Sequence, residues 1–176
     1  MISLLKDDFT YVVNLAGYVD HTNKNKVIKS HFIGCKNLAD IFKKKKIKSF
    51  IQMGSSVEYG KANSPQTENM LCKPVSVYGS SKYLSTKYLL ELYNKYEFPV
   101  TIFRLYQSYG KKQDLNRLIP IVINSCIKNE KFACSDGKQS RDFIYIDDAI
   151  KALFYAMKVD KACLLYTSDA ADDVRG

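Results

Sequence analysis

Apolar residues recur along this chain in two ways, as short uninterrupted runs and as longer stretches with helical spacing. The runs at residues 11–15, 49–53 and 100–105 predict buried strands. Between them, residues 26–45 carry apolar side chains at the spacing of one helical face, and a second, longer helix is predicted over residues 77–96. Strands and helices that alternate in this way are typical of a parallel sheet covered by helices.

The second half of the chain follows this alternation less regularly. Residues 60–75 form a predicted loop that contains two prolines. Helices are predicted over residues 118–128 and 147–158, the latter with Asp147 as its cap, and residues 141–145 are predicted to be extended. No internal repeat interrupts this order, so the sequence indicates one α/β unit.

Composition supports a single globular domain. The chain has 176 residues, of which 46% are apolar, enough to bury a substantial core. No apolar run approaches the length of a membrane span, and residues 1–9 lack the basic-then-apolar order of a signal peptide, so we expect a cytoplasmic protein with no membrane partner. The five cysteines are scattered and include no Cys-x-x-Cys, which argues against a disulfide framework and against a metal site.

The net charge of +9 raises the question of a nucleic-acid partner. The densest basic run, residues 43–46, ends a predicted helix and precedes a strand, where a solvated turn is expected. Lysine is spread along the whole chain, with 23 Lys against 4 Arg, which indicates a general lysine bias and not a phosphate-binding patch. We therefore expect no nucleic-acid partner.

Three side chains supply the groups that hydride-transfer chemistry on a sugar alcohol requires. Ser55 follows a predicted strand, and Tyr78 and Lys82 lie four positions apart at the start of the second helix. Composition alone would produce about 1.7 Tyr-x-x-x-Lys pairs in a chain of this kind. The chain has two, and the second, Tyr83 with Lys87, follows no Pro-x-Ser and is predicted to be ordinary helix surface.

The predicted sheet would gather these side chains at one edge, because ligands of such sheets bind at the carboxyl ends of the strands. Gly17, Ser55 and Tyr106 each follow the end of a predicted strand, and Tyr78 and Lys82 share one helix face. An ammonium about 4 Å from a phenol is worth about 4 kcal/mol at an effective dielectric constant near 20, or about three pKa units. We therefore expect Lys82 to lower the pKa of Tyr78 toward neutrality.

Six ordered motifs resemble the extended short-chain dehydrogenases, specifically the NAD-dependent nucleotide-sugar epimerase/dehydratase family. The motifs are Leu15-Ala16-Gly17, residues 54–60, Tyr78 with Lys82, residues 104–110, residues 116–120 and residues 137–148. The resemblance covers residues 11–158. It implies a partial Rossmann-like, doubly wound parallel α/β sheet that lacks its first strands, together with the start of a small substrate-binding lobe.

The resemblance also implies a role for each motif. Tyr78 would be the acid/base at the sugar hydroxyl, Ser55 would hydrogen-bond the reacting oxygen, and Lys82 would hold the nicotinamide ribose. NAD or NADP is the implied cofactor, and the residues that would bind it are Leu15, Ala16, Gly17, Tyr78, Lys82 and Tyr106. A nucleoside-diphosphate sugar is the implied substrate, and the residues that would bind it are Gln107, Asn116, Arg117, Leu118 and Arg141.

The sequence suggests different roles for Arg141 and Arg104. Arg141 would clamp the substrate diphosphate, because a planar guanidinium matches phosphate better than an ammonium does. The structural alternative is a salt bridge from Arg141 to Asp142 or Asp147. Arg104 lies in a predicted strand and is expected to be structural.

Departures from the family pattern narrow the reaction. Dehydratases of the family carry Asp-Glu directly after the catalytic Ser or Thr, whereas this chain has Ser56 and Val57. That difference disfavours 4,6-dehydration and leaves 4-epimerisation and 4-keto reduction open. His31 and Gln107 stand where many members have Asn, and neither His31 nor His21 has a predicted partner. The alternative function is a non-catalytic dinucleotide-binding or regulatory member of the same fold.

The glycine-rich T-G-x-x-G-x-x-G turn, which binds the cofactor pyrophosphate in the family, does not occur in the chain. We interpret residues 1–115 as the C-terminal part of a NAD(P)-binding domain and residues 116–162 as an incomplete substrate-binding region. Residues 163–176 resemble the translation of a sequencing adapter and are interpreted as non-native. We therefore expect a fragment that is inactive by itself, from a parent enzyme that forms a homodimer through the helix that carries Tyr78.

Overall fold

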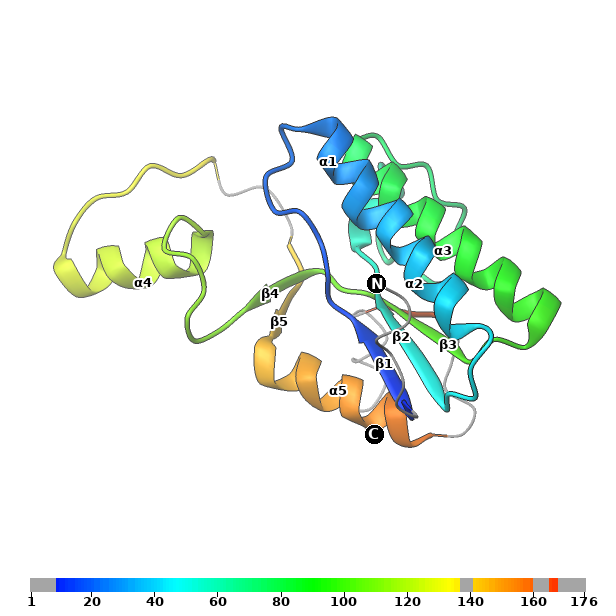
Figure 1. The fold of residues 1–176 in the computed structure, drawn as a ribbon. Helices are drawn as coiled ribbons and strands as arrows, with labels where there is room; N and C mark the ends of the chain where they lie inside the picture. Colours follow the sequence, from blue (N-terminus) through cyan, green and yellow to red (C-terminus); the bar gives the residue numbers. More distant parts are fainter. Residues whose placement is uncertain (1–8, 137–140, 160–164, 168–176) are drawn as a thin grey trace.

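A four-stranded parallel sheet forms the centre of the computed structural model, which describes residues 9–136, 141–159 and 165–167 (Figure 1). In spatial order the strands are β1 (Tyr11–Asn14), β2 (Ser49–Met53), β3 (Val100–Arg104) and β6 (Leu165–Thr167). The register pairs Val12 with Phe50 and Gln52 with Ile102. The three strands that the sequence predicted are therefore confirmed, and β2 has the predicted bounds.

Two helical stretches cover one face of this sheet (Figure 1). The first consists of α1 (Lys24–Ile28), the π-helical turn η2 (Lys29–Ile33) and α2 (Gly34–Phe42). The second is α3 (Val77–Tyr96). The sequence predicted one helix over residues 26–45, but the helical stretch ends at Phe42, and the four consecutive lysines after it lie in a turn.

The bounds of α3 are those predicted, and local contacts at its ends explain them. The Ser76 hydroxyl accepts a hydrogen bond from the backbone N–H of Gly79 at 3.0 Å and so caps the amino end. At the other end Glu97 adopts the left-handed conformation, with φ of 52°, which stops the helix. This cap fixes the first two turns of α3, which carry Tyr78 and Lys82.

The core lies on both faces of the central strands. Phe50 of β2 and Leu89 of α3 are fully buried in the larger cluster, between the sheet and the helices α2 and α3. On the opposite face, α5 (Ile146–Lys158) packs against Ile51 and Phe103. Burial on both faces explains why these strands are uninterrupted apolar runs in the sequence.

The second half of the chain adds a small sheet and an isolated helix. β4 (Gln107–Tyr109) pairs in parallel with β5 (Phe143–Tyr145), and the sequence did not predict β4 because three residues are too few to show a periodicity. α4 (Leu118–Lys128) has the predicted bounds and no buried side chain. Figure 1 shows α4 extending away from the central sheet.

The predicted cap of α5 at Asp147 is wrong. The helix begins at Ile146, and its N-cap residue is Tyr145, which makes no side-chain capping bond. β5 runs directly into α5, so the strand sets where the helix begins. Asp147 and Asp148 lie in the first turn, where carboxylates interact favourably with the helix dipole.

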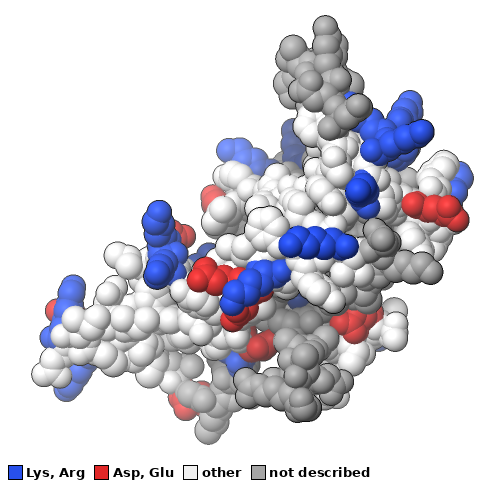
Figure 2. All heavy atoms as spheres, turned by 90° about the horizontal axis from the view of Figure 1, so that it is seen from below, with Lys and Arg blue, Asp and Glu red and all other residues white. Residues whose placement is uncertain are grey.

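Within the described ranges, no helix has both the length and the apolarity needed to cross a membrane. The four cysteines in these ranges are unpaired thiols, of which Cys35 and Cys72 are buried and Cys126 and Cys134 are exposed. Figure 2 shows Lys and Arg spread over one face of the molecule, with Asp and Glu among them. On that face the positive charge of the chain is not gathered into one patch.

Candidate active site

Ser55, Tyr78 and Lys82 come together at the carboxyl end of β2. Ser55 lies two positions after the strand and caps the short 3-10 helix η3 (Ser56–Glu58). Tyr78, in the first turn of α3, lies close enough to Ser55 for the Ser55 side chain to lower its pKa. Lys82 lies one turn further along, with its Nζ 5.9 Å from the centre of the Tyr78 ring. The structure therefore brings a hydroxyl, a phenol and an ammonium into one small region.

A buried polar network holds the ammonium of Lys82 in place. Its Nζ donates a hydrogen bond to the Met53 carbonyl oxygen at 2.7 Å, and Gln52 Nε2 donates to the same oxygen at 2.9 Å. The Gln52 side-chain oxygen in turn accepts bonds from Asn14 Nδ2 at 2.6 Å and from Cys35 Sγ at 3.1 Å. Burial lowers the pKa of Lys82, and the negative charge of a nearby carboxylate opposes this shift.

The expected downward shift of the Tyr78 pKa is wrong. Burial of the phenol raises the pKa of Tyr78, the Ser55 side chain lowers it, and the negative charge of Glu58 raises it again, with a net upward shift. The charge of Lys82 is not among the causes of this shift, and burial of the phenol outweighs the lowering by Ser55. At neutral pH, Tyr78 in this structure therefore carries its proton.

A buried carboxylate, Glu58, fixes the turn that carries Ser55. Its Oε1 accepts a hydrogen bond from the Ser55 backbone N–H at 2.9 Å, and its Oε2 accepts bonds from Thr86 Oγ1 at 2.8 Å and Arg104 Nε at 3.0 Å. Glu58 has no exposed surface, and the Arg104 side chain is 3% exposed. Arg104 is therefore structural, as the sequence suggested. The role of Glu58 was missed, although Ser-x-x-Glu is a capping-box signal.

Both histidines of the chain contact Tyr78. The His21 ring stacks on the Tyr78 ring, with 4.1 Å between centroids and 17° between planes. The His31 ring meets the Tyr78 ring edge-on, at 4.9 Å and 76°. Neither histidine has a role that the sequence predicts, because no motif connects them to the helix that carries Tyr78.

An open cleft of about 780 Å³ lies beside Ser55. Its wall includes Tyr106, Gln107 and Arg141, three residues that the sequence analysis assigned to cofactor or substrate binding. The Tyr106 hydroxyl donates a hydrogen bond to Gln66 Oε1 at 2.6 Å, which ties the loop that carries Gln66 to this wall. The cleft is large enough to take part of a nucleotide sugar.

Comparison with known proteins identifies the family. The model of the "NAD dependent epimerase/dehydratase family" matches residues 1–163. The chain belongs to this family. A dTDP-D-glucose 4,6-dehydratase from Dictyostelium discoideum is 29% identical over 164 residues, which cover 84% of this chain and 38% of that protein. A putative UDP-glucose 4-epimerase from Methanocaldococcus jannaschii is 35% identical over 133 residues, which cover 71% of this chain and 43% of that protein.

Solved structures of epimerases share the fold. A UDP-N-acetylglucosamine 4-epimerase from Methanobrevibacter ruminantium aligns with a TM-score of 0.85 at 27% identity, over 94% of this chain and 56% of that one. This likeness confirms the Rossmann-like parallel α/β sheet predicted from the sequence. The chain spans about two fifths of the length of the two curated relatives and about half of the length of this epimerase.

The other residues that the family resemblance assigned to binding do not reach the cleft. Asn116, Arg117 and Leu118 are exposed at the amino end of α4, and they do not line the cleft. Residues 15–17 follow β1 and are exposed. A side chain at Gly17 would overlap the His31 ring, so the protein's own histidine fills the space beside this glycine.

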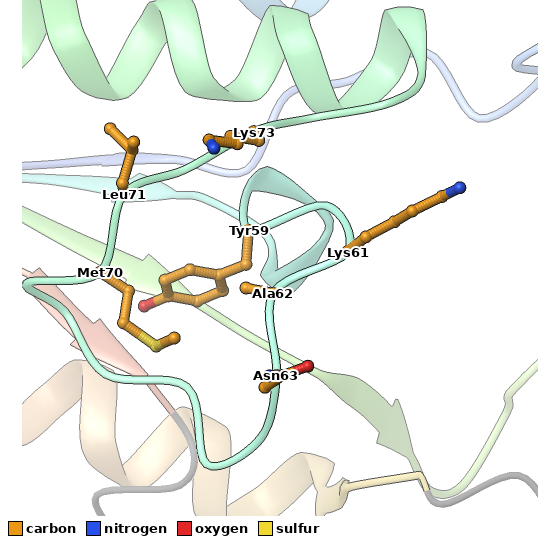
Figure 3. Close-up of a pocket in the computed structure, with 7 residues that line it drawn as sticks. All are labelled: Tyr59, Lys61, Ala62, Asn63, Met70, Leu71 and Lys73. Atoms are coloured by element: carbon orange, nitrogen blue, oxygen red, sulfur yellow. The ribbon is translucent and has the colours of Figure 1, made fainter.

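A second, smaller pocket lies on the far side of the loop that borders the cleft. Its volume is about 380 Å³, and its lining residues are Tyr59, Lys61, Ala62, Asn63, Met70, Leu71 and Lys73 (Figure 3). Figure 3 shows the Tyr59 hydroxyl directed toward Met70, while Lys61 points away from both. Tyr59 is fully buried, and the Arg104 guanidinium lies 4.6 Å from its ring centre. None of these lining residues was predicted from the family motifs.

The burial of His31 predicts a specific pH dependence of stability. Burial lowers the pKa of His31, a hydrogen bond with the Tyr18 backbone raises it, and the charges of Lys82 and His21 lower it further. The unfolded chain therefore binds more protons than the folded chain below about pH 6.5, so the free energy of unfolding should fall as the pH drops through this range. Above about pH 6.5, His31 should contribute no pH dependence to the free energy of unfolding.

We expect urea unfolding midpoints to decrease between about pH 7.5 and pH 5.5, and we expect His31→Gln to remove most of this decrease. His21→Gln is the matched control, because the His21 side chain is exposed, and it should keep the decrease. If His31→Gln loses as much stability on acidification as the wild type does, His31 is not the group responsible.

Proposed function

We propose that the protein is a nucleotide-sugar 4-epimerase or 4-ketoreductase that uses Tyr78 as its acid/base. The observation that carries this proposal is the cluster of Ser55, Tyr78 and Lys82, of which Ser55 lines a cleft that Gln107 and Arg141 also line. A phenol beside a hydroxyl and a buried ammonium suits proton transfer at an alcohol or a ketone. Membership of the epimerase/dehydratase family favours a sugar nucleotide as the molecule that carries this group.

Tyr78 would move the proton. Because burial raises its pKa, the phenol is protonated at neutral pH and ready to donate to a ketone oxygen. In the reverse direction, the phenolate would accept the proton of a sugar hydroxyl. Ser55 lies close to the phenol and would bond the reacting oxygen.

The nicotinamide half of NAD or NADP fits the residues present. An ammonium has three N–H donors, and Lys82 gives one of them to the Met53 carbonyl, so further donors suit a ribose hydroxyl. Once bound, an oxidised nicotinamide supplies a hydride acceptor and a positive charge that favours ionisation of a nearby phenol. Tyr106 and the exposed backbone of residues 15–17 lie past the ends of β3 and β1, where they would contact the cofactor.

The pyrophosphate-binding turn of the family has no counterpart in this sequence. The T-G-x-x-G-x-x-G turn does not occur among the 176 residues, and its backbone N–H groups are what would hold the two phosphates. For this reason the 176-residue chain alone would be inactive, and activity would need a longer form of the protein that carries such a turn.

The substrate would be a nucleoside-diphosphate sugar. Arg141 in the cleft wall has the planar guanidinium that suits a diphosphate, and Gln107 lies beside it in the same wall. Roles for Asn116, Arg117 and Leu118 rest on the family motif alone. A homodimer through α3 rests on the family resemblance alone.

The direct test is an assay of a longer form of the protein with UDP-, dTDP- and CDP-hexoses and their 4-keto derivatives, with products identified by NMR. A 4-epimerase would invert C4 and return NAD unchanged, whereas a 4-ketoreductase would consume one reduced cofactor per sugar. If the protein binds NAD but converts none of these sugars, the proposal fails and a non-catalytic role of the same fold takes its place. Micromolar binding of NAD by the 176-residue chain would contradict the inactivity proposed for it.

A further inference from the structure

Two imidazole rings from separate segments of the chain lie against the Tyr78 phenol. His21 comes from the loop after β1, His31 from the π-helical turn η2, and Tyr78 from the first turn of α3. The His21 ring covers one face of the Tyr78 ring, and the His31 ring contacts it edge-on. The two imidazoles lie 6.2 Å apart at 76°, so they constrain the phenol from two different directions.

His31 is itself held in place. It is 6% exposed, and its Nε2 lies 3.1 Å from the carbonyl oxygen and 3.3 Å from the backbone nitrogen of Tyr18. Its Nδ1 is buried and has no hydrogen-bond partner among the described residues. Gly17 leaves the space that the ring fills, because a Cβ at that position would overlap the ring. Gly17 and Tyr18 therefore hold the imidazole in place.

His21 is fixed through its own loop. The Asp20 carboxylate accepts hydrogen bonds from the backbone N–H of Thr22 at 3.0 Å and from the Thr22 hydroxyl at 2.7 Å, which closes a turn around His21. The loop returns to η2 where the backbone N–H of Tyr18 donates to Ser30 Oγ at 3.1 Å. Both histidines therefore belong to one braced unit that lies against Tyr78.

The other groups around the phenol do not fix its plane. Ser55 acts on the hydroxyl at the tip of the side chain, and Lys82 lies 5.9 Å from the ring centre with its ammonium bonded to a carbonyl. Glu58 acts on the phenol only through its charge. Stacking at 4.1 Å and an edge contact at 4.9 Å are therefore the contacts that define how the ring is oriented.

We propose that His21 and His31 are positioning residues that hold the plane of the Tyr78 ring so that its hydroxyl stays close to Ser55 and faces the reacting oxygen. This inference rests on the proposed function of Tyr78. An acid/base must lie within hydrogen-bond reach of the atom that it protonates, and a shift of about 1 Å in such a group can lower the rate about 100-fold. A histidine pair bracketing the phenol would prevent such a shift.

NMR of the 176-residue chain tests the contacts without any need for activity. The chain has only two histidines, so the ring Cε1–H groups give two signals. Protons above the face of an aromatic ring are shielded, so Tyr78→Leu should move the His21 signal to higher frequency and should also move the His31 signal. Tyr83→Leu, on the same helix, is the matched control and should leave both signals in place. Unchanged histidine signals in a folded Tyr78→Leu variant would overturn the proposal.

If Tyr78→Leu does not fold, nuclear Overhauser effects in the wild type and in Tyr78→Phe decide the same point. Both proteins keep a ring at position 78, so cross-peaks between that ring and the His21 ring protons are expected in both. The absence of these cross-peaks would overturn the proposed stacking.

Kinetics of a longer, active form then separate positioning from mere stability. His21→Leu should lower kcat by up to about 100-fold with little change in KM, and His21→Phe, which keeps a flat ring, should restore most of the loss. An unchanged kcat in His21→Leu, or a loss that Phe does not restore, would overturn the positioning role. Normal turnover in Tyr78→Phe would instead refute the proposed function, and the ring contacts seen by NMR would stand or fall independently.

Discussion

Glu58→Gln is expected to lower the free energy of unfolding by about 3 to 5 kcal/mol, because it leaves the Arg104 guanidinium buried without its anion. The carboxylate accepts bonds from the Ser55 backbone, the Thr86 hydroxyl and Arg104 Nε, and it is completely buried. The amide that replaces it has one oxygen where two are needed, so at least one of these donors also loses its acceptor. Denaturant unfolding monitored by circular dichroism measures the loss.

The exposed pair between Lys151 and Asp148 supplies the matched control, since Asp148→Asn should lower the free energy of unfolding by no more than about 1 kcal/mol. In the double variant Glu58→Gln with Arg104→Met, part of the loss should be recovered, because the unpaired charge is then removed as well. A Glu58→Gln variant as stable as Asp148→Asn would show that the buried pair does not support the fold. The same substitution should also loosen the turn of Ser55.

Tyr78→Phe is expected to reduce kcat by about 100- to 10,000-fold in an active, longer form of the protein, because it removes the group that transfers the proton. Binding of NAD should change little, since the ring remains and Lys82 keeps its bond to the Met53 carbonyl. Stability should change by no more than about 1 kcal/mol, the usual contribution of one hydrogen bond. Steady-state kinetics and calorimetric titration with NAD measure the two effects separately.

Tyr83→Phe is the control for this experiment, because Tyr83 and Lys87 repeat the same spacing on the same helix. It should leave kcat unchanged. A loss of less than about tenfold in Tyr78→Phe would remove Tyr78 from the chemistry. A loss of NAD binding in that variant would mean that the phenol supports the cofactor and would not by itself identify a proton-transfer role.

Local signals were sufficient to predict much of the fold. β2, α3 and α4 have the bounds that the sequence indicated, because apolar periodicity and caps such as Ser76 act within a few residues along the chain. β4 could not be predicted, since its three residues form a strand only through pairing with β5. The cap of α5 was misplaced for a related reason, because β5 decides where the helix starts.

Part of the candidate site could likewise be predicted from the sequence, and part of it could not. The spacing of Tyr78 and Lys82 on one helix, and the position of Ser55 after β2, are properties of the sequence alone, and they were sufficient to bring the three groups together. The sequence was not sufficient to predict the direction of the Tyr78 pKa shift, because burial is produced by segments that are distant along the chain.

The amino-acid sequence by itself determined the family, the order of the longer elements and the residues that supply a hydroxyl, a phenol and an ammonium, since each depends on short motifs or on local periodicity. Only the tertiary structure decided how these groups are held. The bond from Arg104 to Glu58 joins positions 46 residues apart, and the stacking of His21 on Tyr78 joins different segments of the fold. Such contacts form only when helix, loop and sheet pack together, and no local pattern encodes them.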